Sequence, residues 1–137
     1  MMSVRSYLDG ALTVESLDGG TGAGPFRAGD ARGCVAWLAR GEPFAYLHAV
    51  ELNAPGVRRG FHAHPGHRER LYLFSGSVRL LAGRGGARVD IMLQVGDLAT
   101  IAPGVAHGLI AETPAFVVAF GNGTDPIADS VACPELA

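Results

Sequence analysis

The residues best suited to chemistry lie in the stretch GVRRGFHAHPGHRERLYLFSG, residues 56–76. Apolar and polar side chains alternate on both sides of its central turn, which predicts a β-hairpin. Side chains two apart on a strand point to the same face, so His62 and His64 point the same way. Glu69 begins the next strand on its inward face. The hairpin is therefore expected to bring His62, His64 and Glu69 together inside the protein.

His107 is a fourth candidate, because it follows a second turn at Ala102-Pro103-Gly104. Imidazole nitrogens suit divalent transition metals, and one added carboxylate leaves coordination positions open for water or substrate. The candidate cofactor is a divalent ion, Zn, Fe, Mn or Ni, which these ligand types do not distinguish. His67 lies in the turn between the candidate ligands, and we expect it to be a solvated turn residue.

The elements that must position these side chains are short strands. Apolar residues alternate with period two in several runs, separated by glycine and proline breaks, and the chain has 20 glycines and 8 prolines. This pattern predicts an all-β antiparallel sandwich or barrel. The runs are residues 44–52, 69–73, 78–82, 89–93, 98–101, 107–111 and 115–120.

Length and charge limit the remaining possibilities. The 137 residues fit a single domain, with 1–33 as an N-terminal arm and glycine-rich loop, flexible over 18–33, and 121–137 as a surface tail. A formal charge of −2 gives no indication of nucleic-acid or anionic-membrane binding. There is no apolar leader and no run of membrane-spanning length, so we expect a cytoplasmic protein with a small-molecule partner.

The spacing of the candidate ligands resembles that of the cupin family. Gly56, His62, His64, Glu69 and Gly76 match the first cupin motif without departure, and the segment from residue 96 to 107 is similar to the second. Ala102 and Ala111 stand where cupins usually have proline and often asparagine. The resemblance implies a jelly-roll β-barrel, commonly a homodimer, in which His62, His64, Glu69 and His107 bind the metal.

A narrower resemblance connects the chain to the nucleotide-sugar branch of cupins, the deoxysugar 3,4-ketoisomerases and 3,5-epimerases. It rests on DARG at residues 30–33 and RGFHAH at 59–64. In those enzymes the histidine at the His62 position acts as a base, usually without metal. The ketoisomerases generally have glutamine at the position of Glu69 and favour tryptophan at that of Ala106.

The resemblance implies an isomerase or epimerase of a nucleotide-linked keto-deoxysugar. Tyr46 or His48, if their face points inward, is a candidate proton donor, and Arg58 or Arg59 is a candidate for holding a diphosphate. A histidine bound to metal cannot also act as a base, so full ligation would leave that role to Tyr46, His48 or a metal-bound hydroxide. The alternatives are another metal-dependent cupin enzyme, namely an oxygenase, lyase or cyclase of natural-product metabolism, and a non-catalytic small-ligand-binding cupin.

Overall fold

The computed structural model describes residues 3–18 and 23–136, which form thirteen strands and two short 3₁₀ helices. No helix in these segments is long and apolar enough to cross a lipid bilayer. In chain order the elements are β1 Ser3–Tyr7, η1 Leu8–Gly10, β2 Leu12–Ser16, β3 Phe26–Asp30, β4 Gly33–Trp37, β5 Tyr46–Leu52, β6 Arg58–Ala63, β7 Glu69–Ser75, β8 Val78–Arg84, β9 Ala87–Leu93, β10 Asp97–Ile101, β11 Ala106–Ala111, β12 Ala115–Gly121, β13 Val131–Ala132 and η2 Pro134–Leu136.

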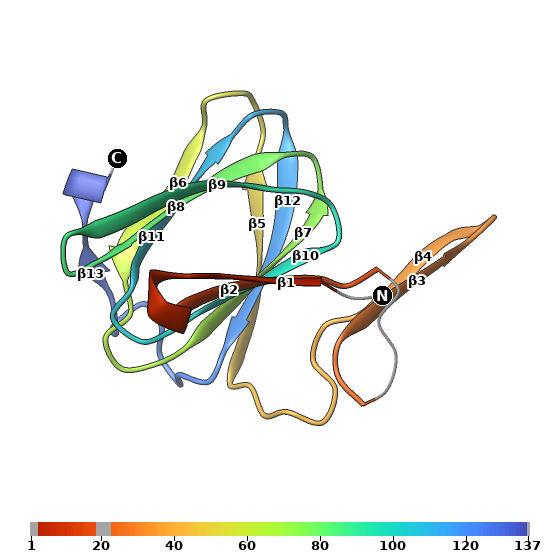
Figure 1. The fold of residues 1–137 in the computed structure, drawn as a ribbon, viewed down its shortest axis with the longest axis horizontal. Coiled ribbons are helices and arrows are strands. Elements are labelled where there is room, and N and C mark those ends of the chain that lie inside the picture. The colour runs from red at the N-terminus through yellow and green to blue at the C-terminus, as the bar shows by residue number, and fades with distance from the viewer. Residues whose placement is uncertain (1–2, 19–22, 137) are drawn as a thin grey trace.

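Most strands belong to two antiparallel sheets that face each other (Figure 1). The larger sheet has the order β1-β2-β10-β7-β12-β5, and the smaller has the order β13-β6-β11-β8-β9. The all-β antiparallel fold predicted from the sequence is confirmed, and the predicted runs between residues 44 and 120 correspond to β5 and β7–β12. The strands are arranged as a sandwich of two sheets.

The main core lies between the two sheets because alternate side chains of each strand point inward. Leu71 and Leu73 of β7 are buried there against Leu80 of the smaller sheet and Val117 of β12. Glu69 has the same parity on β7 as these two leucines. The alternation that buries the apolar side chains therefore also points the Glu69 carboxylate into the space between the sheets.

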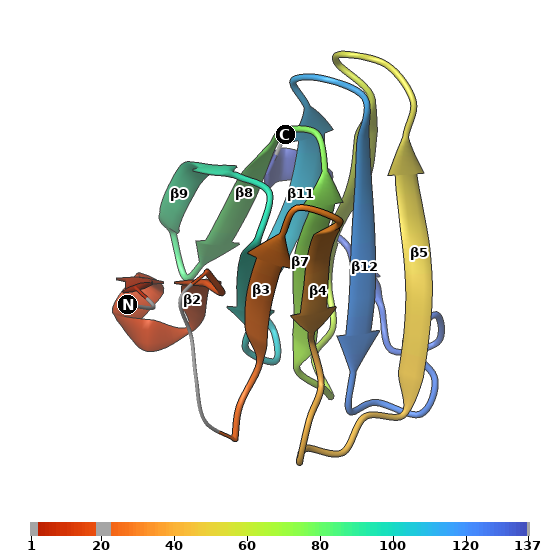
Figure 2. The ribbon, with the colours of Figure 1, turned by 90° about the vertical axis from the view of Figure 1, so that its right-hand side faces the viewer.

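A hairpin of β3 and β4 extends away from both sheets, on the outer side of the larger one (Figures 1 and 2). Its register runs from Phe26 opposite Trp37 to Asp30 opposite Gly33. The prediction of a flexible connection over 18–33 is therefore wrong for residues 26–30 and 33. These short strands lack the alternating apolar pattern because they bury little, and Trp37 remains 49% exposed.

The remainder of the N-terminal arm also contains strands. β1 pairs with β2, and β2 pairs with β10, so the arm completes one edge of the larger sheet. Leu12 and Val14 of β2 are fully buried in the main core. Part of the glycine-rich segment, residues 19–22, lies outside the described residues.

The outer face of the larger sheet is only partly covered. Tyr72 and Phe120 are buried there and pack against Ala36, Leu38 and Ala39. Tyr72 therefore packs on the face opposite Glu69, as its parity on β7 predicts. Leu47 and Phe74 on the same outer face are each 61% exposed.

Candidate active site

A bulge in β6 sets the position of His62. His107 of β11 lies opposite His62, but the next pair is Gly108 opposite Gly60, so Phe61 is an extra residue on β6. Phe61 has a φ of 61°, in the left-handed region that a bulky side chain rarely adopts. Bulges bend a strand and change the direction of nearby side chains. Here the bulge places the His62 and His107 rings 4.9 Å apart, centroid to centroid.

Two backbone carbonyls orient the other two histidine rings. The Nδ1 of His64 donates to the carbonyl of Asp129 at 2.6 Å, and the Nδ1 of His107 donates to the carbonyl of Val105 at 3.0 Å. A neutral imidazole that donates from Nδ1 keeps a lone pair on Nε2. The Nε2 of His64 therefore directs a lone pair toward the Glu69 carboxylate, whereas the Nε2 of His107 hydrogen-bonds to it.

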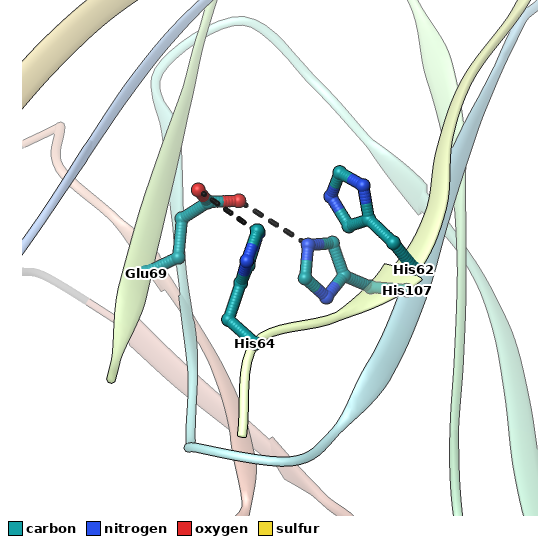
Figure 3. A group of neighbouring side chains, drawn as sticks. All are labelled: His62, His64, Glu69 and His107. Atoms are coloured by element: carbon teal, nitrogen blue, oxygen red, sulfur yellow. Dashed lines mark hydrogen bonds and ion pairs between the residues drawn. The ribbon is translucent and has the colours of Figure 1, made fainter. Parts of the chain in front are cut away.

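The side chains of His62, His64, Glu69 and His107 converge on one point between the sheets (Figure 3). One potential ligand atom from each lies within 4.8 Å of all the others. The Nε2 of His107 is 3.2 Å from Oε1 of Glu69, and the Nε2 of His64 is 3.6 Å from Oε2. The structure thus brings together all four candidate ligands that the sequence predicts. The predicted β-hairpin is wrong, however, because β6 and β7 belong to facing sheets and do not pair.

The chemistry of this cluster fits a divalent cation. The Nε2 of His64 is buried and makes no hydrogen bond among residues 3–18 and 23–136. A buried lone pair that faces a carboxylate oxygen is unfavourable unless a proton or a cation lies between the two. Three imidazoles and one carboxylate would satisfy both groups around one ion and leave positions open for substrate. Metal binding itself stays a prediction.

The protonation states of the cluster agree with this fit. Burial alone would raise the pKa of Glu69, but hydrogen bonding and charge from His107, Tyr46 and His64 outweigh it and lower that pKa to about 2. Burial, with the neighbouring His107 and His64, lowers the pKa of His62 to about 4. At neutral pH the carboxyl is ionised and His62 is neutral, which are the forms that bind a cation.

A cavity of about 340 Å³ opens beside the cluster, between the two sheets. All four cluster residues line it, with apolar side chains from the larger sheet and a few residues of the C-terminal segment. A pocket of this volume with a small number of convergent polar groups is typical of a small-molecule site. The other lining residues are His48, Val50, Arg59, Gly60, Leu71, Gly108, Leu109, Ala119, Pro126, Ile127 and Ser130.

The two predicted proton donors on β5 have different surroundings. His48 lines the cavity, from the sheet that faces His62. The Tyr46 hydroxyl instead donates to Oε2 of Glu69 at 2.5 Å. Burial and this hydrogen bond raise the pKa of Tyr46, so its hydroxyl keeps the proton that it donates. The structure therefore brings His48 to the cavity and places Tyr46 behind Glu69.

The two arginines predicted to bind substrate also differ in their positions relative to the cavity. Arg59 lines the cavity, and its Nε donates to the carbonyl of Glu51 at 3.2 Å. The guanidinium of Arg58 lies 5.5 Å from the centroid of the Phe61 ring. Both side chains are exposed. Arg59 is thus the one of this pair that borders the cavity.

Two residues near the site, His67 and Asp129, have positions that the sequence does not predict. His67 was expected in solvent, but it is buried, with its ring between Tyr46 and Asp129. Its partner Asp129 lies in the C-terminal tail, 62 residues further along the chain. A single aspartate in a polar tail has no spacing that connects it to the histidine motif, so local sequence carries no signal for this contact.

The two packed antiparallel sheets, with the histidine cluster between them, define the fold as a cupin β-sandwich. Comparison with solved structures bears this out. The sugar 3,4-ketoisomerase QdtA of Thermoanaerobacterium thermosaccharolyticum, in complex with TDP, superposes with a TM-score of 0.74. It has 13% sequence identity, over 91% of this chain and 90% of that one.

Two epimerases give similar agreement. The dTDP-6-deoxy-D-glucose-3,5-epimerase RmlC of Legionella pneumophila, solved with dTDP-4-keto-L-rhamnose, has a TM-score of 0.75 and 17% identity over 96% of this chain and 77% of that one. NovW of Streptomyces spheroides, a 4-keto-6-deoxy sugar epimerase, has a TM-score of 0.74 and 19% identity over 96% and 73%. Neither the protein-family models nor the curated proteins give a match. The predicted resemblance to cupins, and to their nucleotide-sugar branch of ketoisomerases and epimerases, is confirmed for the fold.

Proposed function

We propose that this chain is an isomerase or epimerase of a nucleotide-linked keto-deoxysugar, assisted by a divalent metal ion. The observation that carries the proposal is the convergence of four potential ligand atoms within 4.8 Å, in the wall of a cavity that also contains His48. The similarity in fold to solved ketoisomerases and epimerases of such sugars supports the substrate class. The sequence elements at residues 30–33 and 59–64 support the same class.

His62, His64, Glu69 and His107 would hold the ion. A bound divalent ion would polarise the substrate carbonyl and stabilise the negative charge that develops on its oxygen, by roughly several kcal/mol. The chain prepares the ligands in advance. Carbonyl acceptors hold the His64 and His107 rings with Nε2 inward, and the Tyr46 hydroxyl holds one oxygen of Glu69.

The proton-transfer role falls to His48. Isomerisation requires removal of the proton from the carbon next to the carbonyl, while the C–H electron pair forms the C=C bond of an enediolate. For isomerisation, a proton is then delivered to the former carbonyl carbon, the hydroxyl of the neighbouring carbon loses its proton to become the new carbonyl, and the former carbonyl oxygen gains a proton. For epimerisation, a proton returns to the opposite face of the carbon that lost one. His62 would be a ligand, and its pKa of about 4 makes it a weak base at neutral pH. His48 reaches the same cavity from β5 of the facing sheet.

Binding of the nucleotide part is assigned to the exposed rim of the cavity. Arg59 presents its guanidinium there, and an arginine fork matches the oxygens of a diphosphate. Arg58, one residue earlier, would contribute charge to the same rim without lining the cavity. The proposed assembly is a homodimer, for which the exposed Leu47 and Phe74 on the outer sheet face offer an apolar surface.

A second candidate function is a different metal-dependent reaction, by an oxygenase, lyase or cyclase. The observation that favours it is the complete ligand set with Glu69 in place of the usual glutamine, since the sugar enzymes of this branch usually work without metal. Oxygen consumption by the iron-loaded protein would support this candidate. Turnover of substrate by the zinc-loaded protein without oxygen consumption would support isomerase, lyase or cyclase chemistry.

The test is deuterium exchange into the sugar ring of TDP-4-keto-6-deoxyglucose and related keto sugars, followed by proton NMR in D₂O. Glu69→Gln is the decisive variant, with Glu112→Gln, an exposed turn residue, as the matched control. We expect the wild type and the control to exchange deuterium and to contain stoichiometric metal, and Glu69→Gln to lose both. Exchange without metal in Glu69→Gln would overturn the metal-assisted part. Absence of exchange with every sugar in the wild type would overturn the isomerase assignment.

A further inference from the structure

A row of hydrogen-bonded side chains runs from Glu69 away from the cavity. The Tyr46 hydroxyl donates to Oε2 of Glu69 at 2.5 Å, and the Nε2 of His67 lies 3.1 Å from the same hydroxyl oxygen. The Nδ1 of His67 donates to Oδ2 of Asp129 at 2.6 Å. The row connects β7, β5, the turn after β6 and the C-terminal segment, which are far apart in the sequence.

Asp129 contacts the ligand-bearing turn in three ways. Its carbonyl accepts from the His64 ring, and its carboxylate accepts from the Gly66 backbone N–H, at 2.9 and 3.1 Å, and from the His67 ring. Its own backbone is fixed by a hydrogen bond from its N–H to the carbonyl of Asp125 at 3.0 Å. One residue of the tail therefore holds the His64 ring directly and is connected to Glu69 through two side chains.

Three glycines leave the space that this row occupies. A Cβ at Gly66 would lie 2.9 Å from the Asp129 carboxylate, and one at Gly123 would lie 2.5 Å from the His67 ring. A Cβ at Gly121 would collide with the Tyr46 hydroxyl. The chain is thus built closely around each of the three supporting side chains. A row with no room to rearrange can transmit a fixed position to the carboxylate at its end.

We propose that Asp129 is a positioning residue, which fixes the orientation of Glu69 through His67 and Tyr46 and so sets the geometry of the proposed metal site. The expected effect on metal binding rests on the proposed function, in which Glu69 is one of the ligands. Supporting residues that hydrogen-bond to metal ligands orient them, and their loss typically weakens metal binding by about 10- to 100-fold. Members of one hydrogen-bonded row also act together, so that removing two of them costs less than the sum of the separate losses.

The first test uses the metal-free protein, so that it stands even if no metal binds. With ¹⁵N-labelled histidine, the wild type should show a slowly exchanging Nδ1–H proton for His67. Asp129→Asn should remove this signal and also shift the ring nitrogens of His107, which faces Glu69 across the site. Asp9→Asn, the same change on an exposed side chain of η1, is the matched control and should leave both unchanged. Unaltered His107 signals in Asp129→Asn would overturn the proposal.

The second test measures Co²⁺ affinity by chelator competition, together with the visible d–d bands of the bound ion. Asp129→Asn and Tyr46→Phe should each weaken Co²⁺ binding by about 10- to 100-fold and change the band intensities. The double variant should bind about as weakly as the weaker single variant. Independent, multiplicative losses, or wild-type affinity and spectrum in a folded Asp129→Asn protein, would overturn the proposal. Failure of the wild type to bind Co²⁺ would instead count against the proposed metal, and the histidine signals would still decide the role of Asp129.

Discussion

Substitution of Gly108 by alanine tests whether the β6 bulge holds the site in place. A Cβ at Gly108 would lie 2.7 Å from three atoms of the Phe61 ring, a contact that real side chains do not make. Rotation of the ring about its own axis does not relieve the contact, because the ring atom Cγ is one of the three. Either the Phe61 side chain must change rotamer or the backbone of the bulge must move, and overpacking of this kind typically costs about 1–3 kcal/mol.

The assay is urea unfolding of Gly108→Ala beside Gly24→Ala. Gly24 is the control because a Cβ there meets nothing within 4 Å, so its substitution should change the unfolding free energy by less than about 0.5 kcal/mol. Gly108→Ala should lower it by about 1–3 kcal/mol. Since His62 and His107 pair across the bulge, divalent-metal affinity should fall in the same variant.

A double-mutant cycle with Phe61→Gly identifies the cause. Glycine at position 61 removes the ring and also removes the strain of the left-handed conformation, which costs a non-glycine residue about 1–2 kcal/mol. In this background Gly108→Ala should cost little, because the added methyl group has nothing to strike. An equal cost of Gly108→Ala with and without the Phe61 ring would refute the reasoning, since the strain would then arise elsewhere.

Two further predictions concern pH and assembly. The pKa of His62 is about 4 in the folded metal-free protein, below its ordinary value of 6.5, so the unfolded chain binds more protons and stability should fall by about 1–2 kcal/mol as pH drops from 6.5 to 4. Glu69, with a pKa of about 2 against an ordinary 4.5, should add a further loss between pH 4.5 and 2. Urea midpoints across this range should decline less in His62→Asn, and an equal decline would contradict the assignment. The exposed Phe74 and Leu47 suggest a dimer interface, so light scattering should find a dimer that Phe74→Asp converts to a monomer. A wild-type protein that is monomeric at 50 µM, about the usual working concentration, would contradict this prediction.

The strands that sequence predicts well are those that bury one face in the main core. In β7, β8 and β12 the inward residues of the main core are apolar at every second position, with Glu69 at the end of this series, and the alternation is set by the pleat itself. β3 and β4 have no such pattern, because the hairpin extends from the body and Trp37 remains half exposed. Their pairing depends on the turn at residues 30–33 rather than on burial, so hydrophobic periodicity does not detect them.

The ligand set is predictable for a local reason, and its orientation is not. His62, His64 and Glu69 lie on β6, in the turn after it and at the start of β7. These strands belong to facing sheets and not to one hairpin, but the short connection between them still brings the three side chains together. The tautomers and ring directions depend instead on distant partners: the Asp129 carbonyl for His64 and the Tyr46 hydroxyl for Glu69. Spacing can therefore identify which groups meet, whereas the geometry that decides how tightly they hold an ion comes from residues with no sequence connection to the motif. For this reason a substitution at Asp129, outside the motif, tests what orients the ligands more directly than removal of a ligand does.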